Sequence, residues 1–338
     1  MCTSITLQSK EKTSYIARTQ DFNILLDDYI GIQIPRKHKV NTSVGDFVTR
    51  YSVMGLSALV QEAPLMSIPD GVNEFGLGGV TQRFSEYAKY GKLEAIESTG
   101  KHPLKSGYFL LWVLSQCKDT YEVEEKIKGV AIADIATFGD GDGEPRHFLF
   151  SDKAGRSIVV EPCEGLGFHV FENKVGVMTN SPDYPSQLAY LSNFTGLSNI
   201  DPIPKVMNGF PLESTGKGLG FVGMPGDYTS LSRFVRASYS LHYSETLNDK
   251  ETIGQAFHLL SSVTIPKGAI KLPEEPEDQS LLYTQYQSVY DLTRQILYIK
   301  LYNNHRIQRI KWQPEQVNET FVQVYPLTQE EDFLDISK

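Results

Sequence analysis

Apolar and polar residues alternate along the start of the chain, first over residues 3–7 and again over residues 14–18. A repeat of two with β-branched and aromatic residues is typical of half-buried strands. The residues between the two segments are all polar, which predicts a turn. A hairpin folded about Lys10–Glu11 would place Cys2 across from Thr19 or Gln20.

The same β-pattern recurs along most of the chain. We predict further strands over residues 29–35, 51–60, 75–80, 147–150, 156–162, 167–171, 175–179, 283–290, 295–302, 307–312 and 320–326. Apolar residues spaced three and four apart predict helices over residues 107–116, 119–129, 231–243 and 252–263. Strands at both ends of the chain with paired helices between them predict an α+β fold of stacked layers.

The sequence between these elements bears on the number of domains. No repeat, low-complexity tract or linker interrupts residues 2–338, so we expect a single domain. Residues 199–220 form a long stretch rich in proline, glycine and polar residues. A loop of this length is usually functional or packs on a partner.

Composition narrows the classes of function. The 338 residues carry a formal net charge of −9, so a nucleic-acid partner is not expected. The longest apolar run, residues 108–114, is too short to cross a membrane, and the N-terminus lacks the pattern of a secretory signal. Three unevenly spaced cysteines suggest a reducing compartment, and we expect a cytoplasmic protein. The seven histidines lack metal-ligand spacing, so neither a metal nor a cofactor is expected.

The candidate chemistry lies at the N-terminus. Cys2 directly follows the initiator Met1, and removal of Met1 would give one residue both a thiol nucleophile and an α-amine base. In the predicted hairpin Arg18 and Asp21 flank the thiol. A guanidinium favours the thiolate, and a carboxylate can orient the amine. The alternative is that Cys2 belongs to a frayed terminus and that Arg18 and Asp21 are surface residues.

Four separated motifs occur in an order that resembles one known family. They are the N-terminal hairpin with its leading cysteine, Asn73-Glu74-Phe75-Gly76-Leu77, residues 177–182 and residues 223–236. Together they resemble the choloylglycine hydrolase family, which contains bile salt hydrolases and penicillin V acylases. The resemblance covers essentially the whole chain. It implies a four-layer αββα N-terminal-nucleophile hydrolase fold, and a homotetramer in which residues 199–220 reach across a subunit interface.

The resemblance also implies roles for three further residues. Asn180 would donate its side-chain amide to the oxyanion, although an asparagine before Pro182 also suits a simple turn. Arg83 would donate through its backbone N–H; its side chain departs from the family, where bile salt hydrolases have asparagine and several penicillin acylases have tyrosine. Arg233 would support the thiolate, the alternative being an ion pair with Asp227.

The acyl pocket should be apolar with few polar anchors. Three apolar segments are near it by analogy with the family, namely residues 22–26, 58–65 and 132–138. From them we expect Phe22, Leu25, Leu59 and Ile135 to contact the acyl group.

These observations predict a hydrolase of linear amides that works through an acyl-thioester on Cys2. Because Arg83 replaces the asparagine usual in bile salt enzymes, the sequence favours penicillin V-like phenoxyacetyl amides. Conjugated bile salts are the close alternative, and N-acyl homoserine lactones are a third. A silent binding protein for N-acyl amides is the alternative of another class. Retention of Met1 would displace the α-amine and abolish the mechanism.

Overall fold

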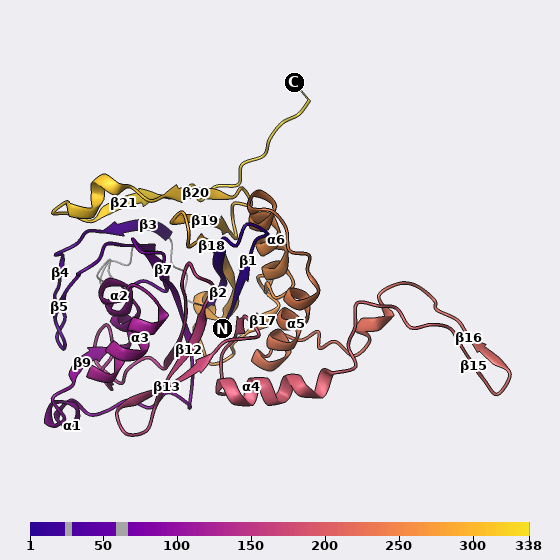
Figure 1. Ribbon diagram of the computed structural model, residues 1–338, viewed down its shortest axis with the longest axis horizontal. Helices are drawn as coiled ribbons and strands as arrows, with labels where there is room; N and C mark the ends of the chain where they lie inside the picture. The colour runs from indigo at the N-terminus through magenta and orange to yellow at the C-terminus, as the bar shows by residue number, and fades with distance from the viewer. Residues whose placement is uncertain (24–28, 59–66, 338) are drawn as a thin grey trace.

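The computed structural model describes residues 1–23, 29–58 and 67–337. The predicted pocket residues Leu25 and Leu59 therefore lie outside the described residues. Most described elements belong to two large, antiparallel β-sheets that lie face to face (Figure 1). Helices cover the outer face of each sheet.

The first sheet contains the strands that carry Cys2, Arg18 and Asp21, the residues to which the sequence analysis assigned the chemistry. Its strand order is β14 (Val177–Met178), β1 (Cys2–Gln8), β2 (Ser14–Phe22), β18 (Leu281–Asp291), β19 (Ile296–Leu301) and β20 (Gln308–Lys311), with β17 (Ile270–Lys271) paired to β18. The N-terminal hairpin is thus enclosed between a mid-chain strand and a C-terminal strand. Cys2 begins β1 inside the sheet, not at a frayed edge.

The second sheet is built mainly from the N-terminal half of the chain. Its order is β13 (Gly167–Glu172), β12 (Ser157–Cys163), β11 (Arg146–Ser151), β8 (Gly78–Arg83), β7 (Asp70–Asn73), β6 (Val53–Ala58), β3 (Tyr29–Ile34) and β21 (Gln323–Pro326). Three short pairs lie apart from it: β4 (Lys39–Val40) with β5 (Phe47–Val48), β9 (His102–Lys105) with β10 (Val130–Ala133), and β15 (Lys205–Met207) with β16 (Phe210–Leu212).

Alternation along the strands of the second sheet divides the core in two. Leu149 and Val159 face the first sheet, whereas their neighbours Phe148 and Val160 face the helices on the other side. The main helices are α2 (Ser106–Gln116) and α3 (Thr120–Lys126) on that side, and α4 (Tyr184–Leu191), α5 (Ser230–Tyr243) and α6 (Asp249–Ser261) beside the first sheet; α1 (Leu93–Ser98) is peripheral. The layers follow because each sheet has two apolar faces to bury. The expected α+β sandwich is confirmed.

The predicted helices and strands are present with shifted ends, but some short elements were not predicted. Helix α4 is one of them, although Asp183 caps it by accepting a hydrogen bond from Ser186 N at 3.0 Å and Pro185 lies in its first turn. Only part of this helix is buried, so its apolar periodicity is weak. Strand β7 was missed because its four residues are too few to show a repeat of two.

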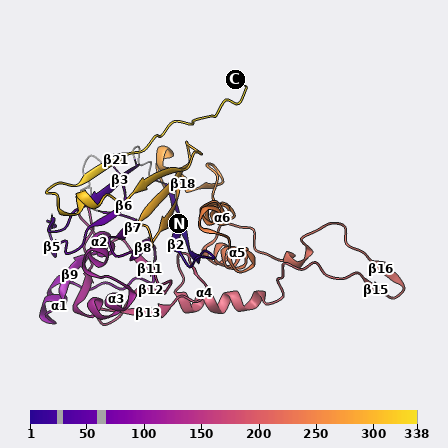
Figure 2. The same cartoon turned by 45° about the horizontal axis from the view of Figure 1, so that its top comes forward.

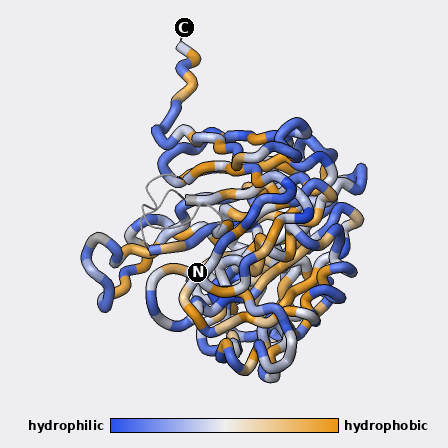
Figure 3. Tube along the Cα trace, turned by 90° about the vertical axis from the view of Figure 1, so that its left-hand side faces the viewer, coloured by the Kyte–Doolittle hydropathy of each residue, from blue (hydrophilic) through white to orange (hydrophobic). Residues whose placement is uncertain are grey.

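Residues 199–222 leave the sandwich as an extended arm that ends in the β15–β16 hairpin (Figure 2). The arm exposes large apolar side chains, namely Ile200, Ile203, Val206, Met207, Phe210, Leu212 and Val222. The C-terminal segment also projects from the body, and apolar residues interrupt its hydrophilic path (Figure 3). In the sandwich the apolar residues lie along the stacked strands instead.

Candidate active site

The pairing of β1 with β2 brings the predicted nucleophile and its cation together. Cys2 pairs with Gln20 and Ser4 with Arg18, in the register expected from the hairpin. The Arg18 side chain runs back along the sheet, and its Nη2 lies 2.8 Å from the Cys2 Sγ. Arg18 also contacts the Gln20 side chain. Cys2 therefore faces a fixed guanidinium, which stabilises a thiolate.

The second sheet holds the Arg18 guanidinium in place. Its Nη1 donates to Pro69 O at 2.7 Å and to Thr81 O at 2.9 Å, and its Nε lies 3.7 Å from Asp70 Oδ2. Burial opposes its charge, but Cys2, Tyr286, Asp70 and Asp21 together raise the pKa of Arg18 above its ordinary value. Burial raises the pKa of Asp70 despite the opposing charge of Arg18. The cation is thus permanent and cannot rotate away from the sulfur.

Arg233, near the start of α5, contacts the backbone of Cys2. Its Nη1 donates to Thr3 Oγ1 at 2.7 Å and to Cys2 O at 2.5 Å, while its Nη2 donates to Asn180 Oδ1 at 2.7 Å. The ion pair with Asp227 considered from the sequence is replaced by these contacts, and Asp227 instead accepts from Ser232 Oγ at 2.7 Å. Burial lowers the pKa of Arg233. Arg233 therefore fixes the backbone of the predicted nucleophile, Cys2, and the side chain of Asn180 together.

Asn180 has its amide orientation imposed by this arrangement. Its Oδ1 accepts from Cys2 N at 2.9 Å as well as from Arg233, so its Nδ2 must point away from both. The Nδ2 donates to Arg83 O at 2.9 Å. An amide nitrogen has two N–H groups, so within the described part of the chain one remains for a substrate oxygen. This geometry suits an oxyanion donor beside the sulfur.

Met1 and Asp21 continue the strand pairing past Cys2. Met1 N donates to Asp21 O at 2.7 Å, and Asp21 N donates to Met1 O at 3.1 Å. The Asp21 carboxylate accepts from Thr284 Oγ1 at 2.6 Å and from Thr19 Oγ1 at 3.1 Å. Burial lowers the pKa of the Met1 α-amine. In this form Cys2 is only 5 % exposed and its nitrogen is a peptide N–H; removal of Met1 would turn that atom into the α-amine.

The remaining predicted residues occupy different surroundings. The Arg83 side chain is exposed and donates from Nε to Ser85 Oγ at 2.8 Å, so only its backbone contacts Asn180. Phe22 is half-buried at the end of β2 and pairs with Tyr283. Ile135 packs against the small cluster of Ile96, Ala131 and Ala133. That cluster contains none of the site residues described above.

Two site residues were missed from the sequence. Gln20 shares the Arg18 guanidinium, and the Cys2 Sγ lies 3.7 Å from its Oε1. Its position across from Cys2 was a usable signal, because cross-strand neighbours interact. Asp70 carried only the weak signal of an acidic residue between apolar neighbours. Its contact with Arg18 joins the two sheets, and such a contact is invisible in the sequence.

Two classes of site are not found in the part of the chain that the structure describes. No group of histidine, cysteine, aspartate and glutamate side chains there is arranged to hold a metal ion. Among the same residues, no helix combines the length and the apolar character needed to cross a membrane. The cysteines are free thiols.

Comparison with known proteins gives the same assignment as the geometry. The model of the linear amide C–N hydrolases of the choloylglycine hydrolase family matches residues 2–325. The chain is 34% identical over 330 residues to a bile salt hydrolase/transferase of Clostridium perfringens, covering 96% of each chain. It is 32% identical to a bile salt hydrolase/transferase of Lactiplantibacillus plantarum, covering 98% of this chain and 99% of the other. A penicillin V acylase of Pectobacterium atrosepticum is 24% identical, with 73% of this chain and 62% of that protein covered.

The solved structures agree. The C2A mutant of the conjugated bile acid hydrolase from Clostridium perfringens superimposes with a TM-score of 0.89 over the full length of both chains, at 29% identity. The penicillin V acylase from Agrobacterium tumefaciens shares the fold, with a TM-score of 0.71 at 21% identity over 96% of this chain and 90% of the other. A leading cysteine beside a buried arginine, on this fold and with this match, identifies the chain as a linear amide C–N hydrolase of the choloylglycine hydrolase family.

Proposed function

We propose that this enzyme hydrolyses the amide bond of conjugated bile salts. The observation that carries the proposal is the extent of the resemblance: the bile salt hydrolases match nearly the whole chain at 32–34% identity. The penicillin V acylase of Pectobacterium matches less of it at 24%. This reverses the preference for penicillin V amides that the sequence suggested.

The earlier preference depended on the side chain of Arg83, and the geometry weakens that argument. Arg83 meets Asn180 through its backbone carbonyl, whereas its side chain is exposed and contacts Ser85. A backbone contact is the same for any residue at this position. Replacement of the usual asparagine therefore says little about the acyl group.

The proposed reaction uses the atoms around Cys2 in two steps, after removal of Met1. The sulfur attacks the amide carbon, and the carbonyl oxygen becomes an oxyanion beside the Asn180 amide. The C–N bond then breaks, and the leaving amine takes a proton from the Cys2 α-ammonium. Water attacks the thioester with the α-amine as base, which releases the carboxylic acid and the thiol. Arg18 stabilises the thiolate before the attack and again when water releases the sulfur from the thioester.

A direct comparison of substrates tests the proposal. Turnover of glycocholate by the wild type should exceed turnover of phenoxymethylpenicillin by at least about tenfold, measured as amine release, since pocket contacts of this size discriminate by one to two orders of magnitude. Cys2→Ala should release no amine from either substrate. Intact mass should show that active preparations have lost Met1. Faster hydrolysis of phenoxymethylpenicillin would restore the alternative assignment.

We further propose a cytoplasmic homotetramer in which the 199–222 arm contacts a neighbouring subunit. The support is the exposed apolar surface of the arm, because patches of this kind commonly mark protein–protein contacts. The free cysteines are compatible with a reducing compartment. Sedimentation analysis should give four subunits for the wild type and smaller species for Phe210→Asp. A wild-type monomer would contradict the assembly.

A further inference from the structure

A single buried side chain spends all of its hydrogen-bonding groups on the segment that carries Asn180. Gln187, in α4, is 0% exposed. Its Nε2 donates to Asn180 O at 2.7 Å and to Pro182 O at 2.8 Å, and its Oε1 accepts from Thr179 N at 3.3 Å and Thr179 Oγ1 at 3.1 Å. Two donors and two acceptor sites are the full capacity of this amide. Gln187 thus forms hydrogen bonds to the backbone before and after the Asn180 side chain, at Thr179, Asn180 and Pro182.

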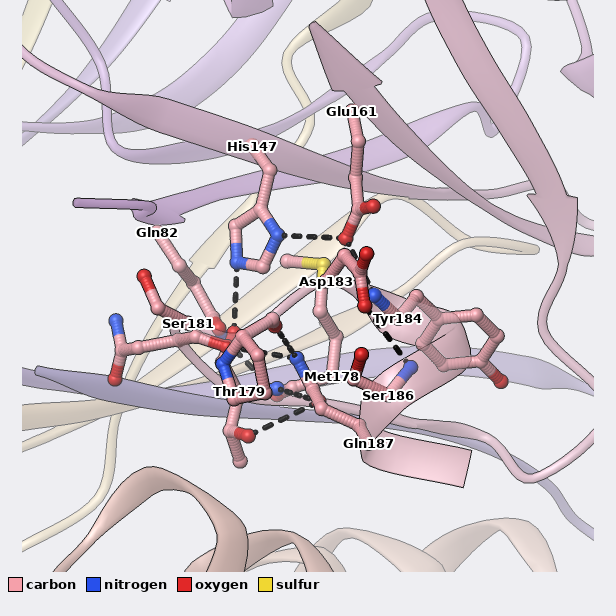
Figure 4. Close-up of polar contacts among 12 residues, drawn as sticks. Gln82, His147, Glu161, Met178, Thr179, Ser181, Asp183, Tyr184, Ser186 and Gln187 are labelled. Carbon is pink, nitrogen blue, oxygen red and sulfur yellow. Dashed lines mark hydrogen bonds and ion pairs between the residues drawn. The ribbon is translucent and has the colours of Figure 1, made fainter. Parts of the chain in front are cut away.

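A second buried group holds the same segment from the neighbouring sheet (Figure 4). The His147 Nε2 lies 2.7 Å from Thr179 O, and its Nδ1 lies 3.3 Å from Glu161 Oε1. Glu161 Oε1 also accepts from Tyr184 N, in the first turn of α4, at 2.9 Å. Because Thr179 O can only accept, the ring must donate to it from Nε2. His147 therefore connects β11, β12 and α4 to the residue before Asn180.

The ring of His147 is itself fixed on its face. It stacks on Phe84 with a centroid distance of 4.3 Å and an interplanar angle of 11°. Phe84 follows Arg83, whose carbonyl accepts from Asn180 Nδ2. Ser181 Oγ also donates to Ser85 O at 2.8 Å. The acceptor that orients Asn180 Nδ2 is therefore held by the same network that holds the Asn180 backbone.

We propose that Gln187 and the His147–Glu161 pair are positioning residues for the reaction, which act by fixing Asn180 as oxyanion donor. The proposal rests on the proposed role of Asn180 in amide hydrolysis. A donor must be preorganised within a few tenths of an ångström to stabilise an oxyanion. Asn180 follows a two-residue strand, β14, which alone cannot supply that precision.

The decisive variant is Gln187→Met, which keeps the volume and removes all four contacts. We expect kcat for an amide that the wild type hydrolyses to fall by about tenfold or more, with KM within about twofold, because an interaction confined to the transition state changes kcat alone. Alkylation of Cys2 by iodoacetamide needs no oxyanion donor, so its rate should stay at the wild-type value. The matched control is Ser186→Ala, on the exposed side of the same helix, which should leave both rates unchanged.

A double variant tests whether Gln187 acts through Asn180. If it does, Gln187→Met combined with Asn180→Ala should be no slower than Asn180→Ala alone. A double variant whose loss of kcat equals the product of the two single losses would overturn the proposal. So would a wild-type kcat in Gln187→Met.

A variant of His147 keeps the proposal testable if Gln187→Met does not fold. His147→Gln retains a donor for Thr179 O, whereas His147→Phe does not, so we expect His147→Gln to keep at least about fivefold more kcat at equal Cys2 alkylation. Equal kcat in the two variants would count against the proposal. Failure of the proposed function is distinct: there the wild type would hydrolyse phenoxymethylpenicillin faster than glycocholate, and the loss of kcat in Gln187→Met would still be measurable on that amide.

Discussion

Two buried cysteines of this enzyme have opposite surroundings. Cys2 is 5 % exposed and Cys117 is 0% exposed, so burial hardly separates them. Cys2 has the Arg18 guanidinium 2.8 Å and the Gln20 Oε1 3.7 Å from its sulfur. Cys117 follows α2 within an apolar cluster that includes Leu104 and Val113, and burial raises the pKa of its thiol to about 12.

The difference lies in the charge that each buried thiol meets. A low-dielectric environment by itself disfavours the thiolate. At Cys2 the first sheet brings a permanent cation into contact with the sulfur, and the second sheet holds the cation with two backbone carbonyls. At Cys117 burial outweighs the charges of Lys126 and Arg50, and no hydrogen bond from a cation to its sulfur is found among the described residues, so this thiol serves packing.

The largest expected effect comes from exchanging each cysteine for alanine. Cys2→Ala should abolish amide hydrolysis, because the attacking atom is gone. Cys117→Ala should keep turnover within about twofold and lower the free energy of unfolding by about 1 kcal/mol, the order expected for one buried heavy atom. Amine release and chemical denaturation measure the two quantities. Loss of turnover in a folded Cys117→Ala would break the contrast.

Native alkylation should strongly favour Cys2 over Cys117. With a pKa of about 12, Cys117 has only about 10⁻⁴ of its molecules as thiolate at pH 8. Iodoacetamide followed by peptide mass mapping should therefore modify Cys2 in the native protein and Cys117 only after unfolding. Each unit of pH below 12 lowers the thiolate fraction of Cys117 tenfold. Labelling of Cys117 in the native protein should therefore become slower still as the pH is lowered. Equal rates in the native state would contradict the assigned environments.

Removal of the cation should make Cys2 behave more like Cys117. For Arg18→Leu we expect the alkylation rate of Cys2 at neutral pH to fall by at least about tenfold, because the thiolate loses its nearest positive charge. Turnover should fall at least as far. Circular dichroism provides the control for folding, since Asp70 loses its partner in this variant. Unchanged alkylation in a folded protein would show that Arg18 does not support the thiolate.

The smallest effect is expected for an arginine at the rim of the site. Arg83→Asn changes an exposed side chain whose charge is screened by water, and the backbone contact to Asn180 remains. Turnover should stay within about threefold of the wild type, and the Cys2 alkylation rate should not change. A loss of tenfold or more would mean that the side chain, and not the backbone, acts at this position.

The sequence predicted the part of the site that depends on local pairing. A hairpin of known turn fixes which residues face each other, so the proximity of Cys2 to Arg18 and Asp21 followed from the alternation of residues 3–7 and 14–18. The main helices and most strands followed from their periodicity. Short elements such as β7 and α4 did not, because neither four residues that are all buried nor eight residues of mixed burial show a clear period.

Asn180 and Arg233 were reached only through resemblance, and Gln187 and His147 not at all. Arg233, Gln187 and His147 lie in different elements, and what unites them is hydrogen bonding to residues 179–182, the segment that contains Asn180. The spacing of single polar residues does not predict such contacts, because a hydrogen bond between distant elements leaves no periodic pattern in the sequence.

The amino-acid sequence by itself determined the layers, the hairpin and the pairing of a terminal thiol with a cation, because these depend on repeats of two and of 3.6 residues and on near neighbours. Only the tertiary structure decided which backbone carbonyls lock Arg18, which way the Asn180 amide points and what holds it there. Those outcomes require atoms far apart in the chain to meet within hydrogen-bonding distance, and that depends on how the two sheets pack.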